Sequence, residues 1–148
     1  MGMIEAVQLF FKNYTNFQGR SRRAEYWWIF LATMIILFVS VFLLATIGGS
    51  LGTDGELDLN PIGFLLTGIL VLGGLAILIP SIALGVRRFH DLGQTGWLVL
   101  VFAILNMLPL VGLLTTIGQL IWMAMPGTTG PNKYGPDPKG GHDVGVFS

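Results

Sequence analysis

The side chains best suited to chemistry lie in two short basic segments of the sequence. Each segment combines arginines with one acid, and the second also contains a histidine. Guanidinium groups bind anionic oxygens through two parallel hydrogen bonds, so this composition predicts a phosphate or lipid-headgroup site. The other interpretation, which is favoured because charge pairs at a membrane boundary are common, is a set of charge pairs that ties two helices together. The residues concerned are Arg20, Arg22, Arg23 and Glu25 in the first segment, and Arg87, Arg88, His90 and Asp91 in the second.

Catalytic and metal-binding chemistry has little support in the sequence. His90 and Asp91 could form an acid–base pair, but a zinc site needs three or four ligands and the other histidine is the distant His142. The chain has no cysteine, and no Ser–His–Asp triad is visible in its sequence. The glycine-rich range 127–135 lacks the Gly-Lys-Ser/Thr ending of a phosphate loop. We therefore expect no enzyme activity, no metal and no cofactor.

The composition of the chain indicates that it resides in a lipid membrane and not in water. Hydrophobic residues make up 53% of the sequence and charged residues only 11%, which leaves too little polar surface for a water-soluble globule. The ranges 27–47, 62–86 and 97–125 contain no charged residue and no histidine. At about 1.5 Å rise per residue, each could cross a hydrocarbon core roughly 30 Å thick. The apolar runs are continuous, not alternating, which excludes a β-barrel.

These features predict an all-α, polytopic membrane protein. A helical membrane domain would occupy residues 1–125, and a Gly/Pro-rich tail would occupy residues 126–148. Within the domain, the range 3–14 carries apolar residues at helical spacing. It predicts an amphipathic helix that either lies on the membrane surface or packs on the protein. Ser21 is the expected N-cap of the helix that enters the first span.

The basic segments predict the orientation of the first two spans. One precedes the first span and the other follows the second, whereas the connecting range 48–61 contains three acids and no basic residue. The positive-inside rule then places both basic segments and the N-terminus in the cytoplasm. Both segments should therefore share one layer at the inner membrane boundary.

The third apolar range admits two geometries because Asn106, Pro109 and Gly112 interrupt it. Its length favours a single broken span, which would leave the tail outside. The distribution of basic residues favours a re-entrant hairpin, which would return the tail to the inside. The side of the tail stays open at this point. Its glycines and prolines predict a turn-rich cap that folds onto the inner boundary through Asn132 and Tyr134.

Three motifs follow one another along the chain. They read Phe17-x-Gly19-Arg20-x-Arg22-Arg23-x-Glu25-Tyr26-Trp27-Trp28, then Arg87-Arg88-Phe89-His90-Asp91-x-Gly93-x-Thr95-Gly96-Trp97, then Gly127-Thr128-x-Gly130-x-Asn132-x-Tyr134-Gly135-x-Asp137-Pro138. In this order they closely resemble the bacterial proteins known as domain of unknown function 805, the YhaH-like inner-membrane proteins. The resemblance implies a small polytopic protein of the bacterial inner membrane and implies no activity. Phe89, Gln94 and the longer third apolar range depart from the family pattern.

Together these observations predict a non-enzymatic protein that binds anionic lipid headgroups or a membrane-protein partner. The site would be a basic-aromatic layer at the inner boundary, made of the two basic segments together with Trp28, Trp97, Asn132 and Tyr134. Expected partners are membrane lipids, a membrane protein or a second copy of the chain, and no nucleic acid. The alternative function is an oligomeric channel or small-solute transporter in which Asn106 and Gln119 line a path.

Overall fold

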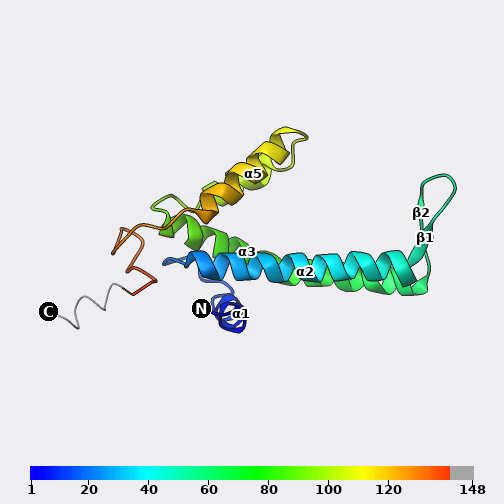
Figure 1. Ribbon diagram of the computed structural model, residues 1–148, viewed down its shortest axis with the longest axis horizontal. Coiled ribbons are helices and arrows are strands. Elements are labelled where there is room, and N and C mark those ends of the chain that lie inside the picture. The colour runs from blue at the N-terminus through cyan, green and yellow to red at the C-terminus, as the bar shows by residue number, and fades with distance from the viewer. Residues whose placement is uncertain (141–148) are drawn as a thin grey trace. The chain divides into compact units, whose positions relative to one another are not determined.

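The computed structural model describes residues 1–140, and the last part of the predicted tail, 141–148, lies outside the described residues. The chain is mostly helical, as predicted, with one small sheet (Figure 1). In chain order the elements are α1 (Met3–Lys12), α2 (Arg23–Ile47), β1 (Gly49–Leu51), β2 (Leu57–Leu59), α3 (Pro61–Asp91), α4 (Leu98–Leu105) and α5 (Val111–Ala124).

The chain divides into two compact units. One unit combines Met1–Ile29 with Pro80–Ser148, and the other is Phe30–Ile79. The helices α2 and α3 each contribute residues to both units. All residues of the predicted basic-aromatic layer belong to the first unit.

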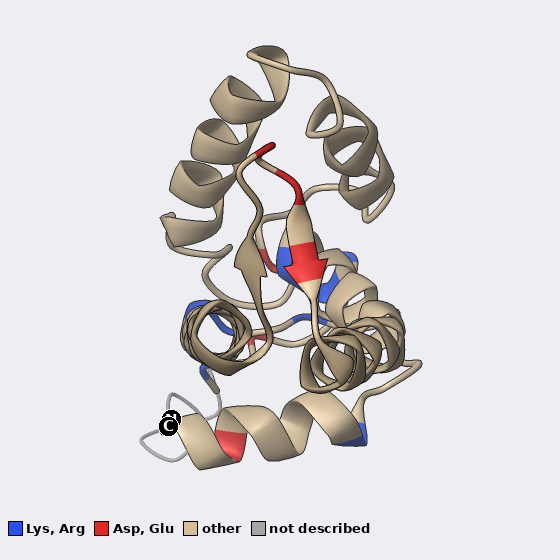
Figure 2. Ribbon diagram, turned by 90° about the vertical axis from the view of Figure 1, so that its right-hand side faces the viewer, with Lys and Arg blue, Asp and Glu red and all other residues tan. Residues whose placement is uncertain are grey.

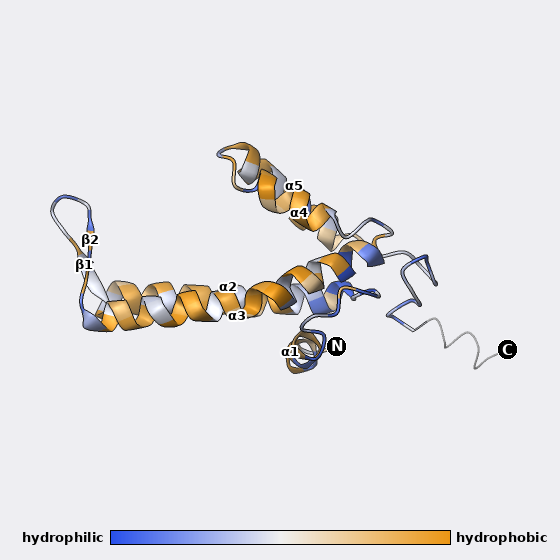
Figure 3. Ribbon diagram, turned by 180° about the vertical axis from the view of Figure 1, so that it is seen from behind, coloured by the Kyte–Doolittle hydropathy of each residue, from blue (hydrophilic) through white to orange (hydrophobic). Residues whose placement is uncertain are grey.

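Two helices have the length and composition of membrane spans. They are α2 and α3, whose surfaces are apolar along most of their length (Figure 3). Large side chains such as Phe38 and Leu72 are 75% and 69% exposed, an arrangement that suits lipid and not water. Both helices exceed the predicted ranges, since α2 begins at Arg23 and α3 continues to Asp91. The second basic segment is therefore the last part of a helix.

The connection between α2 and α3 is a β-hairpin, so the all-α prediction is wrong at this loop. β1 and β2 are antiparallel, and Ser50 lies opposite Asp58. The physical reason is local: Leu57 and Leu59 alternate with Asp58, and Gly55 adopts a φ of +83° in the turn. The charged residues of this hairpin are all acidic (Figure 2).

The third apolar range is broken between Asn106 and Gly112, as predicted, and its two halves form a helical hairpin. α4 has 8 residues and α5 has 14, and both are short for a bilayer crossing. The Asn106 amide donates to Gln119 Oε1 at 3.1 Å, and the rings of Phe102 and Trp122 lie 6.0 Å apart. The turn between the helices contains Leu110 at a φ of 56°. The re-entrant alternative from the sequence describes this geometry.

The N-terminal helix α1 packs on the rest of its unit along one face. Ala6 and Phe10 are buried against the rest of the unit, at 0% and 4% exposure. Ile4 and Phe11 remain exposed on the other side of the helix. One face of α1 therefore packs on the protein, and apolar side chains stay exposed on the other face.

Candidate functional site

The two basic segments meet directly in the first unit. The backbone N–H of Ser21 donates to the carbonyl of Arg87 at 3.1 Å, and Arg87 Nη1 donates to Glu25 Oε1 at 3.1 Å. This contact confirms that the segments lie together. Glu25 pairs across the helices and not with Arg22, its neighbour in sequence. Ser21 is not the predicted N-cap, because α2 begins at Arg23 and the Ser21 hydroxyl has no hydrogen-bond partner among residues 1–140.

Asp91 is the centre of a buried charge cluster. Its Oδ1 accepts from Arg20 Nε at 3.0 Å, and its Oδ2 accepts from Arg88 Nη1. Arg20, Arg88 and Asp91 are 9%, 0% and 2% exposed. Charges removed from water to this degree are stable only when they are paired and hydrogen-bonded. Arg88 is three residues before Asp91 in α3, and Arg20 adds a second cation from another part of the chain.

The same arginines bind backbone carbonyls that the sequence did not indicate. Arg88 Nη2 donates to the carbonyl of Met123 at 2.9 Å and to that of Met125 at 2.5 Å. Arg20 donates to the carbonyls of Thr128 and Gly130. The last carbonyls of a helix lack partners within it, and Pro126 just after α5 was the signal that such groups would be available. Arg88 therefore holds the end of α5, and Arg20 holds the tail.

The described part of the tail folds back onto α3, as predicted. The Asn132 amide donates to the carbonyl of His90 at 2.9 Å, and the Tyr134 ring stacks on the His90 ring with centroids 4.0 Å apart. Within the tail, the N–H groups of Lys139 and Gly130 donate to Asp137 and lower the pKa of its carboxyl group. The third motif is thus a cap on the end of α3.

The remaining charged and aromatic residues of the layer lie at its periphery. Arg23 is exposed and donates to the carbonyl of Ala124 at 3.1 Å. Arg22 is half-buried and has no carboxylate partner among residues 1–140. Trp28 Nε1 donates to the carbonyl of Met1 at 3.0 Å, which fixes the start of the chain. Arg22 and Arg23 are the arginines that the buried ion pairs do not use.

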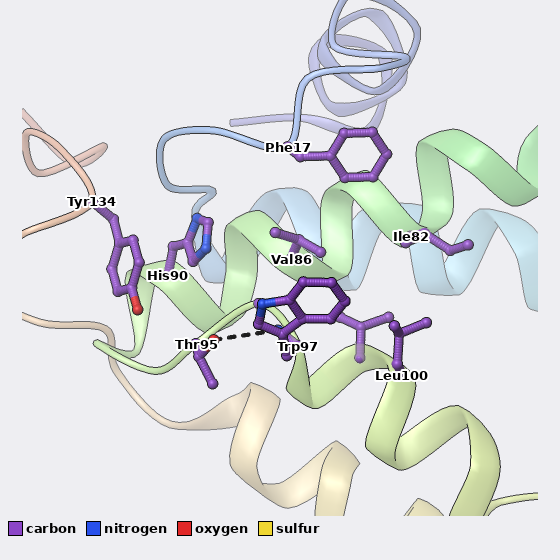
Figure 4. A pocket seen from close by; sticks show the side chains of 10 residues that line it. Phe17, Ile82, Val86, His90, Thr95, Trp97, Leu100 and Tyr134 are labelled. Atoms are coloured by element: carbon purple, nitrogen blue, oxygen red, sulfur yellow. Dashed lines mark hydrogen bonds between the residues drawn. The ribbon is translucent and has the colours of Figure 1, made fainter.

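An apolar cleft of about 500 Å³ opens beside the cap (Figure 4). Phe17 lies on one side of the cleft and Trp97 on the other, while the stacked rings of His90 and Tyr134 lie at one end. Trp97 is 73% exposed. His90 Nδ1 lies 3.0 Å from the carbonyl of Gly19. A mostly apolar cleft with a few polar groups suits a hydrocarbon or aromatic group of a ligand.

A second cavity of about 420 Å³ is polar and was not anticipated from the sequence. Its charged lining consists of Glu5, Arg20, Arg22, Glu25 and Arg87. Arg87 is only 4% exposed, yet its Nε and Nη2 atoms have no hydrogen-bond partner among residues 1–140. We refer to this space as the polar cavity. The described residues contain no group of three or more His, Asp or Glu side chains placed to hold a metal ion.

Two apolar helices of membrane-spanning length, joined at one end by buried arginine–carboxylate pairs, define a helical membrane protein. The chain belongs to the family described as protein of unknown function (DUF805), whose model matches residues 14–136. It is 36% identical over 128 residues to inner membrane protein YhaH of Escherichia coli strain K12, covering 86% of this chain and 91% of YhaH. It is 34% identical over 131 residues to inner membrane protein YhaI of the same strain, covering 88% and 92%. No solved structure matches the chain.

Proposed function

We propose that this chain is a multi-pass protein of the bacterial inner membrane, with its N-terminus in the cytoplasm, that binds anionic lipid and does not act as an enzyme. The binding surface is the basic-aromatic layer. Its arginines without a carboxylate partner, Arg22 and Arg23, attract the headgroup, and the apolar surfaces around the layer accommodate the hydrocarbon part of the lipid.

The charge of the layer is the observation that carries this proposal. Its two segments contain five arginines but only two carboxylates, so the layer has an excess of three positive charges. The buried pairs use both carboxylates, Glu25 and Asp91. Arg22 and Arg23 have no carboxylate partner among the described residues. Each arginine near an anionic membrane surface contributes about 1 kcal/mol of attraction.

Apolar and aromatic surfaces support a lipid as the source of the negative charge. Ile4 and Phe11 are exposed on α1, as expected for a helix at the headgroup boundary. The apolar cleft lies in the same compact unit and is bordered by the exposed ring of Trp97. A tryptophan at such a boundary typically anchors a membrane protein in the interface.

The test measures which lipids the protein retains. The full chain is reconstituted into nanodiscs that contain phosphatidylethanolamine and phosphatidylglycerol, and the lipids bound to the protein are counted by native mass spectrometry. We expect phosphatidylglycerol to be enriched. Two charges at about 1 kcal/mol each correspond to roughly a 30-fold effect, so Arg22→Gln with Arg23→Gln should abolish most of the enrichment.

The matched control removes two positive charges elsewhere. Lys133→Gln with Lys139→Gln makes the same change in net charge at two exposed tail positions. This control should retain most of the enrichment. Equal lipid composition around wild-type and Arg22/Arg23 variant proteins would refute the proposal.

A further inference from the structure

We infer that the polar cavity is a phosphate-binding site in which the free edge of the Arg87 guanidinium group holds two oxygens of the phosphate. The phosphate can come from a lipid headgroup, and in that case the inference deepens the proposed function and rests on it. A free phosphate ion is the other source. Both present the same chemistry to Arg87.

The hydrogen bonding of Arg87 leaves one specific edge of its side chain available. Nη1 donates to Glu25 Oε1 at 3.1 Å, whereas Nε and Nη2 donate to no atom among the described residues. In an arginine these two N–H groups point in nearly the same direction and match two oxygens of one phosphate or carboxylate. A buried guanidinium edge without acceptors is costly, so an acceptor that fills the cavity would stabilise it.

Comparison with Arg20 shows how this chain normally satisfies such an edge. Arg20 also lines the polar cavity, and it uses Nε and Nη2 together to contact Asp91, with Nη2 at 2.9 Å from Oδ1. Arg20 and Arg88 share Asp91 and bind carbonyls with their remaining N–H groups. Among these three buried arginines, Arg87 alone keeps an unused edge within the described residues.

The surroundings of Arg87 favour a phosphate group over a simple carboxylate. A carboxylate offers two oxygens, which the free edge of Arg87 would already engage. A phosphate group offers additional oxygens, and the cavity has further donors in the side chains of Arg22 and Gln18. Neither side chain donates a hydrogen bond within residues 1–140, so both are available to the ligand. The volume of about 420 Å³ also leaves room for more than the anion itself.

The competing explanation is that the protein fills this position itself. Glu5 lines the cavity from α1 and is exposed, so a change in its side-chain rotamer could bring its carboxylate to Arg87. Glu5→Gln separates the two explanations. As a single substitution, it removes a negative charge from the cavity wall and should therefore strengthen phosphate binding relative to the wild-type protein.

The experiment measures binding of inorganic phosphate to the full chain purified in a phosphate-free nonionic detergent, by isothermal titration calorimetry. We expect saturable binding of one phosphate per chain, with acetate at least tenfold weaker. A parallel titration with short-chain phosphatidic acid tests the headgroup as the source. Tighter binding of that lipid than of inorganic phosphate assigns the site to a headgroup, and the reverse order assigns it to a free ion.

Three variants make the test specific to the cavity. Arg87→Lys retains the positive charge beside Glu25 but removes the two parallel donors, and Leu9→Trp fills the cavity from α1 without changing any charge. Both should weaken phosphate binding at least tenfold. Lys133→Arg, at an exposed tail position outside the cavity lining, should change it less than twofold. If Arg87→Lys does not fold, as judged by thermal unfolding, Leu9→Trp provides the decisive comparison.

The outcomes also separate this inference from the proposed function. Wild-type protein that binds neither phosphate nor the short-chain lipid, or binding that survives Arg87→Lys or Leu9→Trp in folded protein, would overturn the phosphate site. Binding seen only in Glu5→Gln would show that Glu5 occupies Arg87 and would overturn it as well. Anionic-lipid enrichment in nanodiscs can persist in either case, whereas its loss with phosphate binding retained would refute only the proposed function.

Discussion

Arg20 Nε lies 3.0 Å from Asp91 Oδ1 although 71 residues separate the two side chains in sequence. This pair joins the segment before α2 to the end of α3. Asp91 also contacts Arg88, and both arginines continue to backbone carbonyls of α5 or the tail. One carboxylate therefore connects four segments of the first unit.

Replacing Asp91 should destabilise this unit strongly. Asp91→Asn leaves Arg20 and Arg88 buried without their counterion, and breaking a buried pair in this way costs about 3–5 kcal/mol. The measurement is the free energy of unfolding in detergent. Asp58→Asn in the β-hairpin, at an exposed position, is the matched control and should change stability by less than about 0.5 kcal/mol. Equal stabilities of the two variants would contradict the central role of Asp91.

Removing one member of the Glu25–Arg87 pair should also lower the free energy of unfolding. Glu25→Leu leaves the Arg87 charge buried and should cost about 3–5 kcal/mol, again measured by unfolding. Adding Arg87→Met replaces the pair by apolar side chains and should restore most of that loss, because no buried charge remains. Additive effects of the two substitutions would show that the residues do not interact. Glu56→Leu, at an exposed position of the β-hairpin, serves as the control.

Gly127 should tolerate no side chain. A Cβ at this position would overlap Asp91 Oδ2 and lie 2.5 Å from Asp91 Cγ, and the two arginines prevent the carboxylate from moving away. Gly127→Ala should therefore cost about 1–3 kcal/mol. Gly68→Ala is the informative comparison, since nothing lies within 4 Å of the added atom inside helix α3. That substitution should stabilise the protein by about 0.5–1 kcal/mol, opposite in sign.

The helical hairpin predicts that the tail is on the cytoplasmic side. Arg88 contacts the carbonyls of Met123 and Met125, so the end of α5 returns to the end of α3. The chain has no cysteine, which allows single cysteines to be introduced and labelled with a membrane-impermeant reagent. Gln8→Cys and Lys139→Cys should be labelled only from the cytoplasmic face, and Ser50→Cys only from the opposite face. Labelling of Lys139→Cys together with Ser50→Cys would refute this topology.

The alternative function as a channel depends on the polar residues of the hairpin. Asn106 donates to Gln119 and accepts from the Thr115 hydroxyl at 2.6 Å, so these groups satisfy one another. We expect Asn106→Leu to leave lipid enrichment unchanged and to cost about 1–3 kcal/mol, because it leaves polar partners unpaired. Met107→Leu is the neighbouring control. Solute flux through wild-type protein in liposomes that disappears in Asn106→Leu would establish the channel function instead.

The predictions from sequence succeeded where the signal is local. Continuous apolar runs identify α2 and α3, because crossing a bilayer requires a length of helix that can be counted directly. The contact between the two basic segments was also predicted, because the positive-inside rule assigns both to one side of the membrane. The β-hairpin was missed because strands of three residues carry almost no periodicity. The third range kept two possible geometries because its total length is compatible with one long helix or two short ones.

The amino-acid sequence by itself determined that this protein belongs in a membrane. It also indicated that the two basic segments lie next to each other and that the third motif caps them. Hydrophobicity and charge act over short distances along the chain, so these properties can be read without coordinates. Only the tertiary structure decided which arginine meets which carboxylate, because Glu25 and Asp91 each had a nearby basic residue in sequence and one of them, Glu25, pairs elsewhere. It also decided that Arg87 retains a free guanidinium edge in the polar cavity, since the shortage of acceptors around one buried side chain depends on every segment that packs against it.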